Sequence, residues 1–251
     1  MSEREIENLQ TQKNESYAAT NILQISEGSL ENYNNYIVKK IYKDAVAHFP
    51  SDDLSLRVCD FGAGVGSLSE ILRRHYGIRP ICVELDPKQR VILKSRDFAS
   101  YAQIEDYGKK FCYVFTSNVL EHIEDDNETL MRISQALEPK GRIAIYVPAL
   151  PFLFSDLDKS VGHYRRYKRS ELIAKVEKAG FKVDSCKYND SVGVLASVVL
   201  KVFGFKPESG FGSKTSLLIY DKVFFPISRF LDVLLFSRLV GKNLFLFAEK
   251  T

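Results

Sequence analysis

Three glycines lie within five positions of the stretch CDFGAGVGS, which spans Cys59–Ser67 and follows an apolar run. They are Gly62, Gly64 and Gly66, and Asp60 precedes them. Because glycine has no side chain, such a turn lets the backbone approach a ligand closely. A strand, an acidic residue and a glycine turn that leads into a helix favour an adenosine-containing cofactor. The stretch therefore predicts a ligand of this type, and a tight turn without a ligand is the alternative.

The spacing of the glycines distinguishes between cofactor classes. The dinucleotide fingerprint GxGxxG requires its third glycine at position 67, where this chain has Ser67. Here the third glycine is Gly66, one position earlier. The spacing disfavours a dinucleotide, so an NAD(P)-dependent oxidoreductase is kept only as an alternative function.

An acidic residue also follows the next apolar run, in the sequence ICVELDP. Glu84 lies at the predicted carboxyl end of that strand, where a carboxylate accepts hydrogen bonds from ribose hydroxyls in dinucleotide folds. A solvated loop carboxylate is the alternative. Asp86 directly precedes a proline and is predicted to cap the following helix.

Two of the four histidines follow predicted strands, where the functional side chains of a parallel sheet gather. His122 lies in TSNVLEHIEDD and His163 in GHYRRYKR. Either imidazole could act as a general base for a reacting group that must lose a proton. For His122 the alternative is a residue that organises its loop. His48 and His75 are predicted to be surface residues.

The GHYRRYKR segment combines basic and aromatic side chains. Arginine forks suit a carboxylate or phosphate, and tyrosines suit a sugar or a ring. We therefore predict that Tyr164, Arg165 and Arg166 contact the substrate. The alternative is a solvated basic face in which one arginine pairs with Asp156 or Asp158. We predict no metal site.

Strands alternate with helices along most of the chain, which favours parallel βαβ units in a doubly wound α/β sheet. The predicted strands are residues 56–60, 80–84, 98–101, 111–117, 142–148, 181–188 and 243–249. The predicted helices are residues 31–49, 67–76, 87–94, 126–137 and 170–179. Ligands of such sheets bind beyond the carboxyl ends of the strands, where the glycine turn, Glu84 and both histidines are expected.

Three segments in this order resemble the class I S-adenosylmethionine-dependent methyltransferases of the small-molecule type. DFGAGVG is similar to their first motif, TSNVLEHIEDD to the segment after their fourth strand, and LEPKGRIAIYVP to their turn before the fifth strand. The resemblance covers about residues 55–188, with residues 243–250 as the last strand. It implies a Rossmann-like, mostly parallel seven-stranded sheet with an antiparallel last strand. It also implies S-adenosylmethionine as cofactor, S-adenosylhomocysteine as product and in-line methyl transfer.

The resemblance assigns ten residues to cofactor binding. They are Asp60, Gly62, Ala63, Gly64, Gly66, Glu84, Leu85, Asn118, Val119 and Leu120. Residues 1–54 are predicted to form an N-terminal helical lid region in which Tyr33 contacts substrate, as N-terminal helices do in similar enzymes. Packing of that helix against the core is the alternative.

Residues 189–242 are predicted to form an apolar helical insertion between the core, residues 55–188, and the last core strand, residues 243–251. Three interpretations stay open for residues 192–240: extra core, a homodimer face, or a helix that contacts a membrane peripherally. No uncharged stretch is long enough to predict a spanning helix.

Composition restricts the remaining classes of function. The chain has 251 residues, 45% of them hydrophobic, and a formal net charge of +3. This mild charge gives no indication of a nucleic-acid partner. The polar N-terminus has no secretion signal and no cysteine pair shows CxxC spacing, so reduced thiols and a cytoplasmic location are expected. We predict a methyltransferase that acts on a small molecule, such as a sugar or a lipid-linked glycan. A scaffold that keeps the cofactor fold without catalysis is the second alternative.

Overall fold

The computed structural model describes residues 28–50, 57–203, 214–233 and 237–251. The strands are β1 (Val58–Phe61), β2 (Ile81–Val83), β3 (Ser100–Tyr101), β4 (Phe111–Ser117), β5 (Leu137–Pro148), β6 (Phe181–Asn189) and β7 (Asn243–Lys250). The helices of the core are α2 (Glu31–His48), α3 (Ser67–Tyr76), α4 (Pro87–Ser95), α5 (Asp126–Ala136), α6 (Asp156–Ser160) and α7 (Arg169–Lys178). Between β6 and β7 lie α8 (Ser191–Phe203), α9 (Lys214–Ile219), a π-helical turn (Tyr220–Phe224), α10 (Phe225–Leu231) and α11 (Ser237–Leu239).

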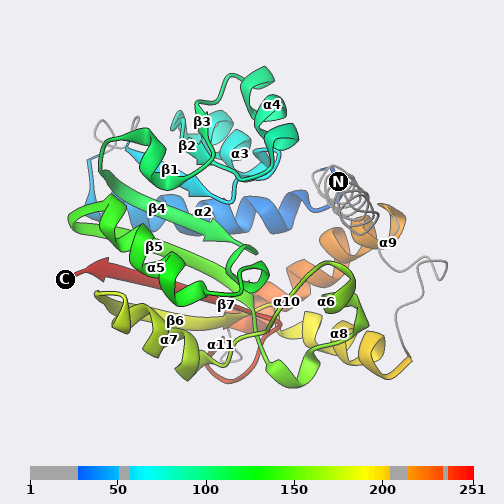
Figure 1. The fold of residues 1–251 in the computed structure, drawn as a ribbon. Coiled ribbons are helices and arrows are strands. Elements are labelled where there is room, and N and C mark those ends of the chain that lie inside the picture. The colour runs from blue at the N-terminus through cyan, green and yellow to red at the C-terminus, as the bar shows by residue number, and fades with distance from the viewer. Residues whose placement is uncertain (1–27, 51–56, 204–213, 234–236) are drawn as a thin grey trace, which may run out of the picture.

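Within these ranges the strands form one seven-stranded sheet in the order β3-β2-β1-β4-β5-β7-β6. The pairs from β3 to β5 are parallel, and β7 is antiparallel to both of its neighbours. Figure 1 shows the sheet between helices. The predicted Rossmann-like, doubly wound sheet with an antiparallel last strand is therefore confirmed.

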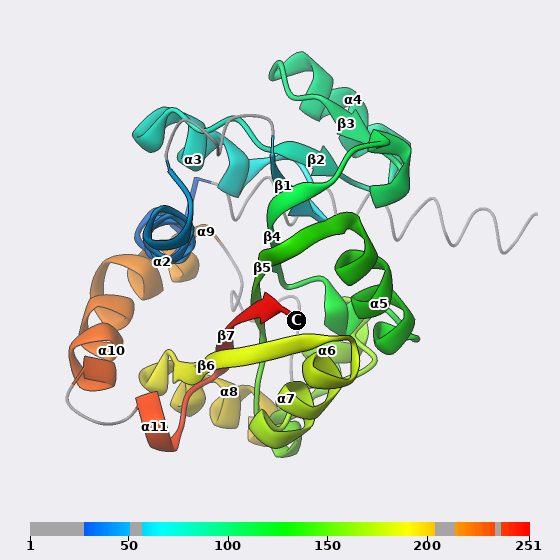
Figure 2. The ribbon, with the colours of Figure 1, turned by 90° about the vertical axis from the view of Figure 1, so that its left-hand side faces the viewer.

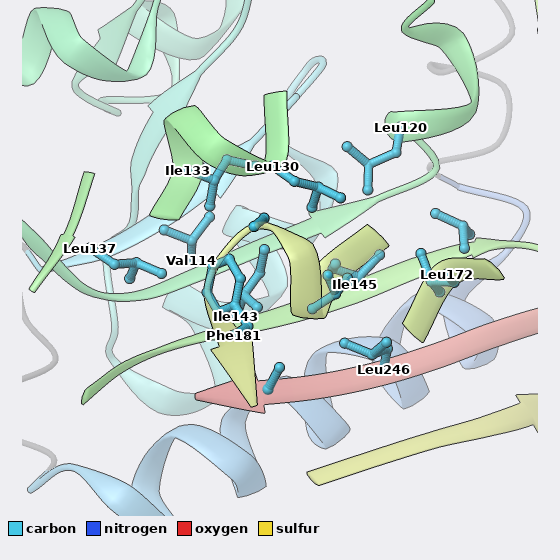
Figure 3. Close-up of a cluster of buried hydrophobic side chains, with 14 of the residues drawn as sticks. Val114, Leu120, Leu130, Ile133, Leu137, Ile143, Ile145, Leu172, Phe181 and Leu246 are labelled. Atoms are coloured by element: carbon cyan, nitrogen blue, oxygen red, sulfur yellow. The ribbon is translucent and has the colours of Figure 1, made fainter. Parts of the chain in front are cut away.

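The central strands bury both of their faces, so they are apolar without a polar side. In β4, Tyr113 and Phe115 pack with α2 and α3 on one face, while Val114 packs with α5 and α7 on the other. Figure 3 shows the second face, where Leu130 and Leu172 are among the side chains that cover the sheet. All four cysteines are buried and none is in a disulfide bond, as the apolar strand sequences predict.

The start of β5 differs from the prediction. The sequence predicted a turn at Glu138–Gly141 and a strand from Arg142, but the strand begins at Leu137. Leu137 pairs with Phe111 of β4, and the register then shifts before Tyr113 pairs with Arg142. Lys140 has a φ of 62°, so the predicted turn is an irregularity inside an extended segment.

Helix α2 packs on the sheet along most of its length. Ile37, Val38 and Ile41 are buried in the same cluster as β4 and α3. Most of this helix therefore packs against the core, which was the alternative to a lid. Its first turn, which contains Tyr33, lies beside the insertion. Residues 1–27 and 51–54 of the predicted lid region lie outside the described residues.

The insertion is helical, as predicted, and lies at one end of the sheet next to α2 (Figure 2). Helix α10 contacts both α8 and α2. Among the described residues, no helix is both long enough and apolar enough to cross a membrane.

Candidate active site

The glycine turn lies at the middle of the sheet, where successive strands go to opposite sides. Strand β1 pairs with β2 on one side and with β4 on the other, so the loops after β1 and β4 meet at the topological switch point. The contact is tight. A Cβ on Gly62 would lie 2.3 Å from Cγ2 of Val119, in the loop after β4. Only glycine fits at position 62 without moving one of the two loops.

All three glycines of the turn have positive φ angles, 76° at Gly62, 58° at Gly64 and 84° at Gly66. L-residues with side chains rarely adopt this conformation. A Cβ on Gly66 would also lie 2.7 Å from Cδ2 of Leu93 in α4, while Ser67 is simply the first residue of α3. The third glycine is therefore required at position 66, which explains the departure from the dinucleotide fingerprint.

Glu84 is held against the glycine turn by two backbone groups. Its Oε2 accepts a hydrogen bond from Gly64 N at 2.8 Å, and its Oε1 accepts one from Asp86 N at 2.9 Å. Each carboxylate oxygen can accept a further bond, so the fixed side chain retains capacity for ligand hydroxyls. The neighbouring Leu85 is 77% exposed and offers an apolar surface at the same strand end. Asp86 caps α4 as predicted, accepting from Lys88 N at 2.8 Å.

Asp60 lies beneath the turn and is only 3% exposed. Its carboxylate accepts a hydrogen bond from Ser69 Oγ at 2.6 Å. Burial raises the pKa of Asp60 to about 7, against the lowering effect of the Ser69 bond. The structure thus shows Asp60 as a support that ties β1 to α3.

The loop after β4 presents its backbone at the same edge of the sheet. Asn118 has a φ of 53°, and its N–H donates to the Tyr146 carbonyl at 2.8 Å. This bond holds the loop against β5 and leaves the Asn118 side chain exposed. Leu120 points into the core and fixes the loop from below (Figure 3). The fold therefore brings the glycine turn, Glu84 and Asn118 to one edge, which we call the cofactor edge.

The two predicted catalytic histidines lie together, although 41 positions separate them in the sequence. Their ring centroids are 4.6 Å apart in an edge-to-face arrangement. His163 Nδ1 lies 2.9 Å from Asp158 Oδ1, which fixes the orientation of the ring. His122 is exposed, and its pKa is lowered by partial removal from water and by His163. At neutral pH it is therefore an uncharged imidazole that can accept a proton.

Glu121 belongs to the same cluster, and the sequence analysis missed it as a functional residue. It is fully buried, and neither carboxylate oxygen has a hydrogen-bond partner among the described residues. Its Oε1 lies 3.9 Å from His163 Nε2. Burial raises the pKa of Glu121 to about 8. A signal was present, because Glu121 directly precedes His122, but the local pattern does not reveal that its carboxylate is buried.

Arg165 and Arg166, the two arginines predicted to contact the substrate, are paired within the protein. Arg166 is buried and its Nε donates to Asp158 Oδ1 at 2.8 Å, as the structural alternative predicted. Hydrogen bonds from His163 and Arg166 outweigh the effect of burial and lower the pKa of Asp158. Arg165 pairs with Asp126 at 2.9 Å. Tyr164 is 55% exposed, so it has the most accessible side chain of the three predicted substrate contacts in this segment.

Tyr33 lies in the first turn of α2. Its ring packs against Tyr146 of β5 at 5.9 Å and against Phe225 of α10 at 5.0 Å. It therefore joins the first turn of α2 to both the sheet and the insertion.

One grouping at the site has the spacing of metal ligands. Glu121, His122 and His163 each offer one suitable atom, and these atoms all lie within 4.8 Å of one another. Both ring nitrogens of His163 face carboxylates, Asp158 and Glu121. The cluster can handle protons or hold a divalent cation, and the two uses differ in their response to a chelator.

Comparison with known families decides between the cofactor classes. A family described as a methyltransferase domain matches residues 33–185, which include β1 to β5 and the whole cofactor edge. The chain belongs to this methyltransferase family. No significant match was found among curated protein sequences.

Solved structures with the same fold include methyltransferases of low sequence identity to this methyltransferase. A protein from Galdieria sulphuraria, proposed to be a sarcosine dimethylglycine methyltransferase, is 14% identical, with 87% of this chain and 84% of that chain covered and a TM-score of 0.56. A SAM-dependent methyltransferase from Archaeoglobus fulgidus is 17% identical, with 86% and 94% covered and a TM-score of 0.53. Phosphoethanolamine N-methyltransferase 2 from Haemonchus contortus, solved with S-adenosyl-L-methionine, is 18% identical, with 88% and 52% covered and a TM-score of 0.54. These structures share the sheet and its helices with the present enzyme.

Proposed function

We propose that this enzyme transfers the methyl group of S-adenosylmethionine to a small molecule, with His122 as the group that takes up the released proton. The observation that carries the proposal is the cofactor edge. There the Gly62 backbone approaches Val119 too closely for any side chain, and Glu84 is fixed by two backbone N–H groups. The family model and the solved structures that contain the cofactor support the same assignment.

The residues of the edge suit the parts of this cofactor. Glu84 would accept hydrogen bonds from the ribose hydroxyls, and the exposed Leu85 would lie against the adenine. The glycine turn with Ala63 would lie beneath the methionine portion, and Asn118 and Val119 would line it from the other side. Leu120, which is buried in the core, would support their loop. Bound S-adenosylmethionine supplies an electrophilic methyl group on a sulfonium ion.

An acceptor hydroxyl or amine that loses a proton during methylation needs a base. His122 is exposed, uncharged at neutral pH and located directly after the residues assigned to the cofactor. His163 packs edge-on against it and is itself held by Asp158. We assign proton uptake to His122 and orientation of its ring to His163. The proton that the acceptor hydroxyl or amine loses on methylation would pass to His122, and the cofactor would leave as S-adenosylhomocysteine.

The acceptor is a small molecule, such as a sugar, a lipid-linked glycan or another metabolite. Tyr33 and Tyr164 are its aromatic contacts. Arg165 and Arg166 are paired with carboxylates, so their contribution is to shape the loop and to offer the donor groups that those pairs leave free.

The test is transfer of an isotopically labelled methyl group from S-adenosylmethionine into a cell extract, with analysis of the labelled product by mass spectrometry. The proposal expects a labelled small molecule and no label when Gly62 is replaced by alanine. Absence of label with the wild-type protein, or label found only in protein or nucleic acid, contradicts it.

A further inference from the structure

The helical insertion has an inverted distribution of polar and apolar residues. Asp190, Ser228 and Asp232 are buried, at 1%, 0% and 8% exposure. They bond to one another and to backbone: Ser228 Oγ donates to Asp190 Oδ1 at 3.0 Å, and Asp190 N donates to Asp232 Oδ2 at 2.8 Å. The polar residues therefore hold the helices together from within.

Apolar side chains cover the outside of the same helices. In the described part of the chain, eleven exposed large apolar side chains lie between residues 191 and 239, against six elsewhere. In α8 they follow helical spacing, with Leu195 and Val202 at 68% and 69% exposure, while Ser197 is buried. A second stripe continues through α9, the π-helical turn and α10, formed by Ile219, Val223, Ile227 and Phe230. Helices of soluble proteins normally turn their apolar face toward the core and their polar face toward water.

The exposed charges beside these stripes have one sign. Every exposed charged side chain in residues 190–203, 214–233 and 237–242 is basic, namely Lys201, Lys214, Lys222, Arg229 and Arg238. The acidic residues in these ranges are all buried. An apolar stripe flanked by lysine and arginine is the pattern of a helix that lies in the interface of an anionic membrane.

The same charges argue against a homodimer through this face. A two-fold interface places each patch against its own copy, so Lys222 and Arg229 of both chains would approach each other. Extra core, the remaining interpretation from the sequence, fits Phe225, which is buried against α2, but it does not account for the exposed stripe. A membrane surface satisfies both the apolar and the basic side chains.

The stripe also lies close to the first turn of α2, which contains the predicted substrate contact Tyr33. Asp221 accepts hydrogen bonds from Asn32 N at 2.9 Å and from Tyr33 N at 2.8 Å, which fixes the insertion to the first turn of α2. A groove of about 330 Å³ opens there, between Asn32 and the α10 residues Phe225, Arg229 and Phe230. The docking face thus adjoins Tyr33, the predicted substrate contact.

We propose that the apolar face of Ile219, Val223, Ile227 and Phe230, flanked by Lys222 and Arg229, docks this methyltransferase onto a membrane surface that contains anionic lipids. Docking brings the first turn of α2 to the lipid surface, where a lipid or lipid-linked acceptor would be available. Binding to the membrane does not depend on the proposed methyl transfer.

The experiment is flotation of the full chain with vesicles of phosphatidylcholine alone or of phosphatidylcholine and phosphatidylglycerol in equal parts. The proposal expects flotation with the anionic vesicles only, and weaker binding at high salt because the charges are screened. Phe230→Ser should weaken binding roughly tenfold because an apolar side chain is lost from the interface. Arg229→Gln and Lys222→Gln should each weaken it roughly fivefold.

Val223→Ser and Val91→Ser form a matched pair, because both valines are exposed on helices, at 50% and 67%, and only Val223 lies in the docking face. Cooperative urea unfolding, followed by circular dichroism, verifies that each variant is folded without relying on cofactor binding. Val223→Ser should reduce flotation and Val91→Ser should not. No flotation of the wild type, equal effects of the two valine changes, or equal binding to both kinds of vesicle would overturn the proposal. A stable dimer in light scattering without vesicle binding would overturn it in favour of a second copy.

Discussion

The cofactor edge and the insertion differ in which side chains they expose to the surroundings and which they bury. At the cofactor edge Leu120 points inward, Glu84 is half-buried, Asn118 is exposed, and Leu85 is the one large apolar side chain of the assigned residues that is exposed. In the insertion Asp190, Asp221 and Asp232 are inside and Phe230 is outside. The first surface suits a polar ligand in water, and the second suits an apolar medium. One chain therefore carries two surfaces that different measurements can separate.

The largest effect is expected from the proposed base. His122→Gln removes the proton acceptor and should lower kcat by about 10²- to 10⁴-fold, with affinity for S-adenosylhomocysteine and vesicle binding unchanged. His75→Gln is the matched control, because His75 is also exposed but lies near the end of α3. Steady-state kinetics with the identified acceptor measures both. If His122→Gln retains more than about a tenth of the wild-type kcat, the methyl acceptor needs no base from this residue.

A steric change at the glycine turn should act on cofactor binding. Gly62→Ala adds a methyl group 2.3 Å from Val119, whereas a Cβ on Gly77, whose φ of 71° is similar, meets nothing within 4 Å. Both variants carry a backbone cost of about 1–2 kcal/mol, but only Gly62→Ala displaces the loop after β4. Calorimetry should show at least a roughly 100-fold loss of S-adenosylhomocysteine affinity for Gly62→Ala alone, about 3 kcal/mol. Equal affinities for the two variants would show that the contact with Val119 is irrelevant to binding.

Glu84→Gln should have a smaller effect on the same binding reaction. Hydrogen bonds to a charged group contribute about 1.5–3 kcal/mol, so affinity for S-adenosylhomocysteine should fall roughly 10- to 100-fold. Asp86→Asn is the control, because an asparagine at that position still caps α4. Calorimetric titration of the three proteins gives the comparison. A loss of affinity in Asp86→Asn as large as in Glu84→Gln would argue that the geometry of the strand end, and no ribose contact, is responsible.

Asp60 should make the free energy of unfolding depend on pH. Its pKa is raised from 3.8 to about 7 in the folded protein, so between these values the folded state holds a proton that the unfolded state has released. Stability therefore falls as pH rises through this window, and above about pH 7 the full cost of the buried charge is present. Asp60→Asn should remove this dependence on pH, which the shift sets at about 4 kcal/mol across the window, in urea unfolding of the cofactor-free protein. An unchanged difference between the two proteins from about pH 4 to about pH 7 would contradict the raised pKa.

The smallest effect is expected from metal removal. If Glu121, His122 and His163 handle protons, dialysis against a chelator should leave kcat unchanged. Loss of activity that divalent cations restore would instead assign these residues to a metal site, against the prediction from sequence. Flotation with anionic vesicles should be the same before and after dialysis.

Local patterns predicted the central elements well. The apolar run of β4 and the amphipathic helix α3, which ends before Gly77, have the predicted bounds. The start of β5 was missed because a proline, a lysine and a glycine indicate a turn, while pairing of Leu137 with Phe111 extends the strand through them. Tertiary pairing prevailed over local turn preference there.

The parts of the site that depend on the spacing of residues along the sequence could be predicted. The glycine at position 66 disfavoured the dinucleotide pattern, and its close approach to Leu93 explains why glycine is needed there. Burial of Glu121 could not be predicted, because it results from loops after β4 and β5 that fold over each other. The helical spacing of Ile227 and Phe230 predicted a stripe but not its direction, since the same spacing serves a helix that faces the core or one that faces away from it.

Calorimetric titration of the wild-type protein with S-adenosylhomocysteine tests the central claim most directly. The account predicts saturable binding of one ligand per chain, lost in Gly62→Ala and kept in Gly77→Ala. Absence of binding of both S-adenosylhomocysteine and S-adenosylmethionine to the folded wild-type protein would contradict it.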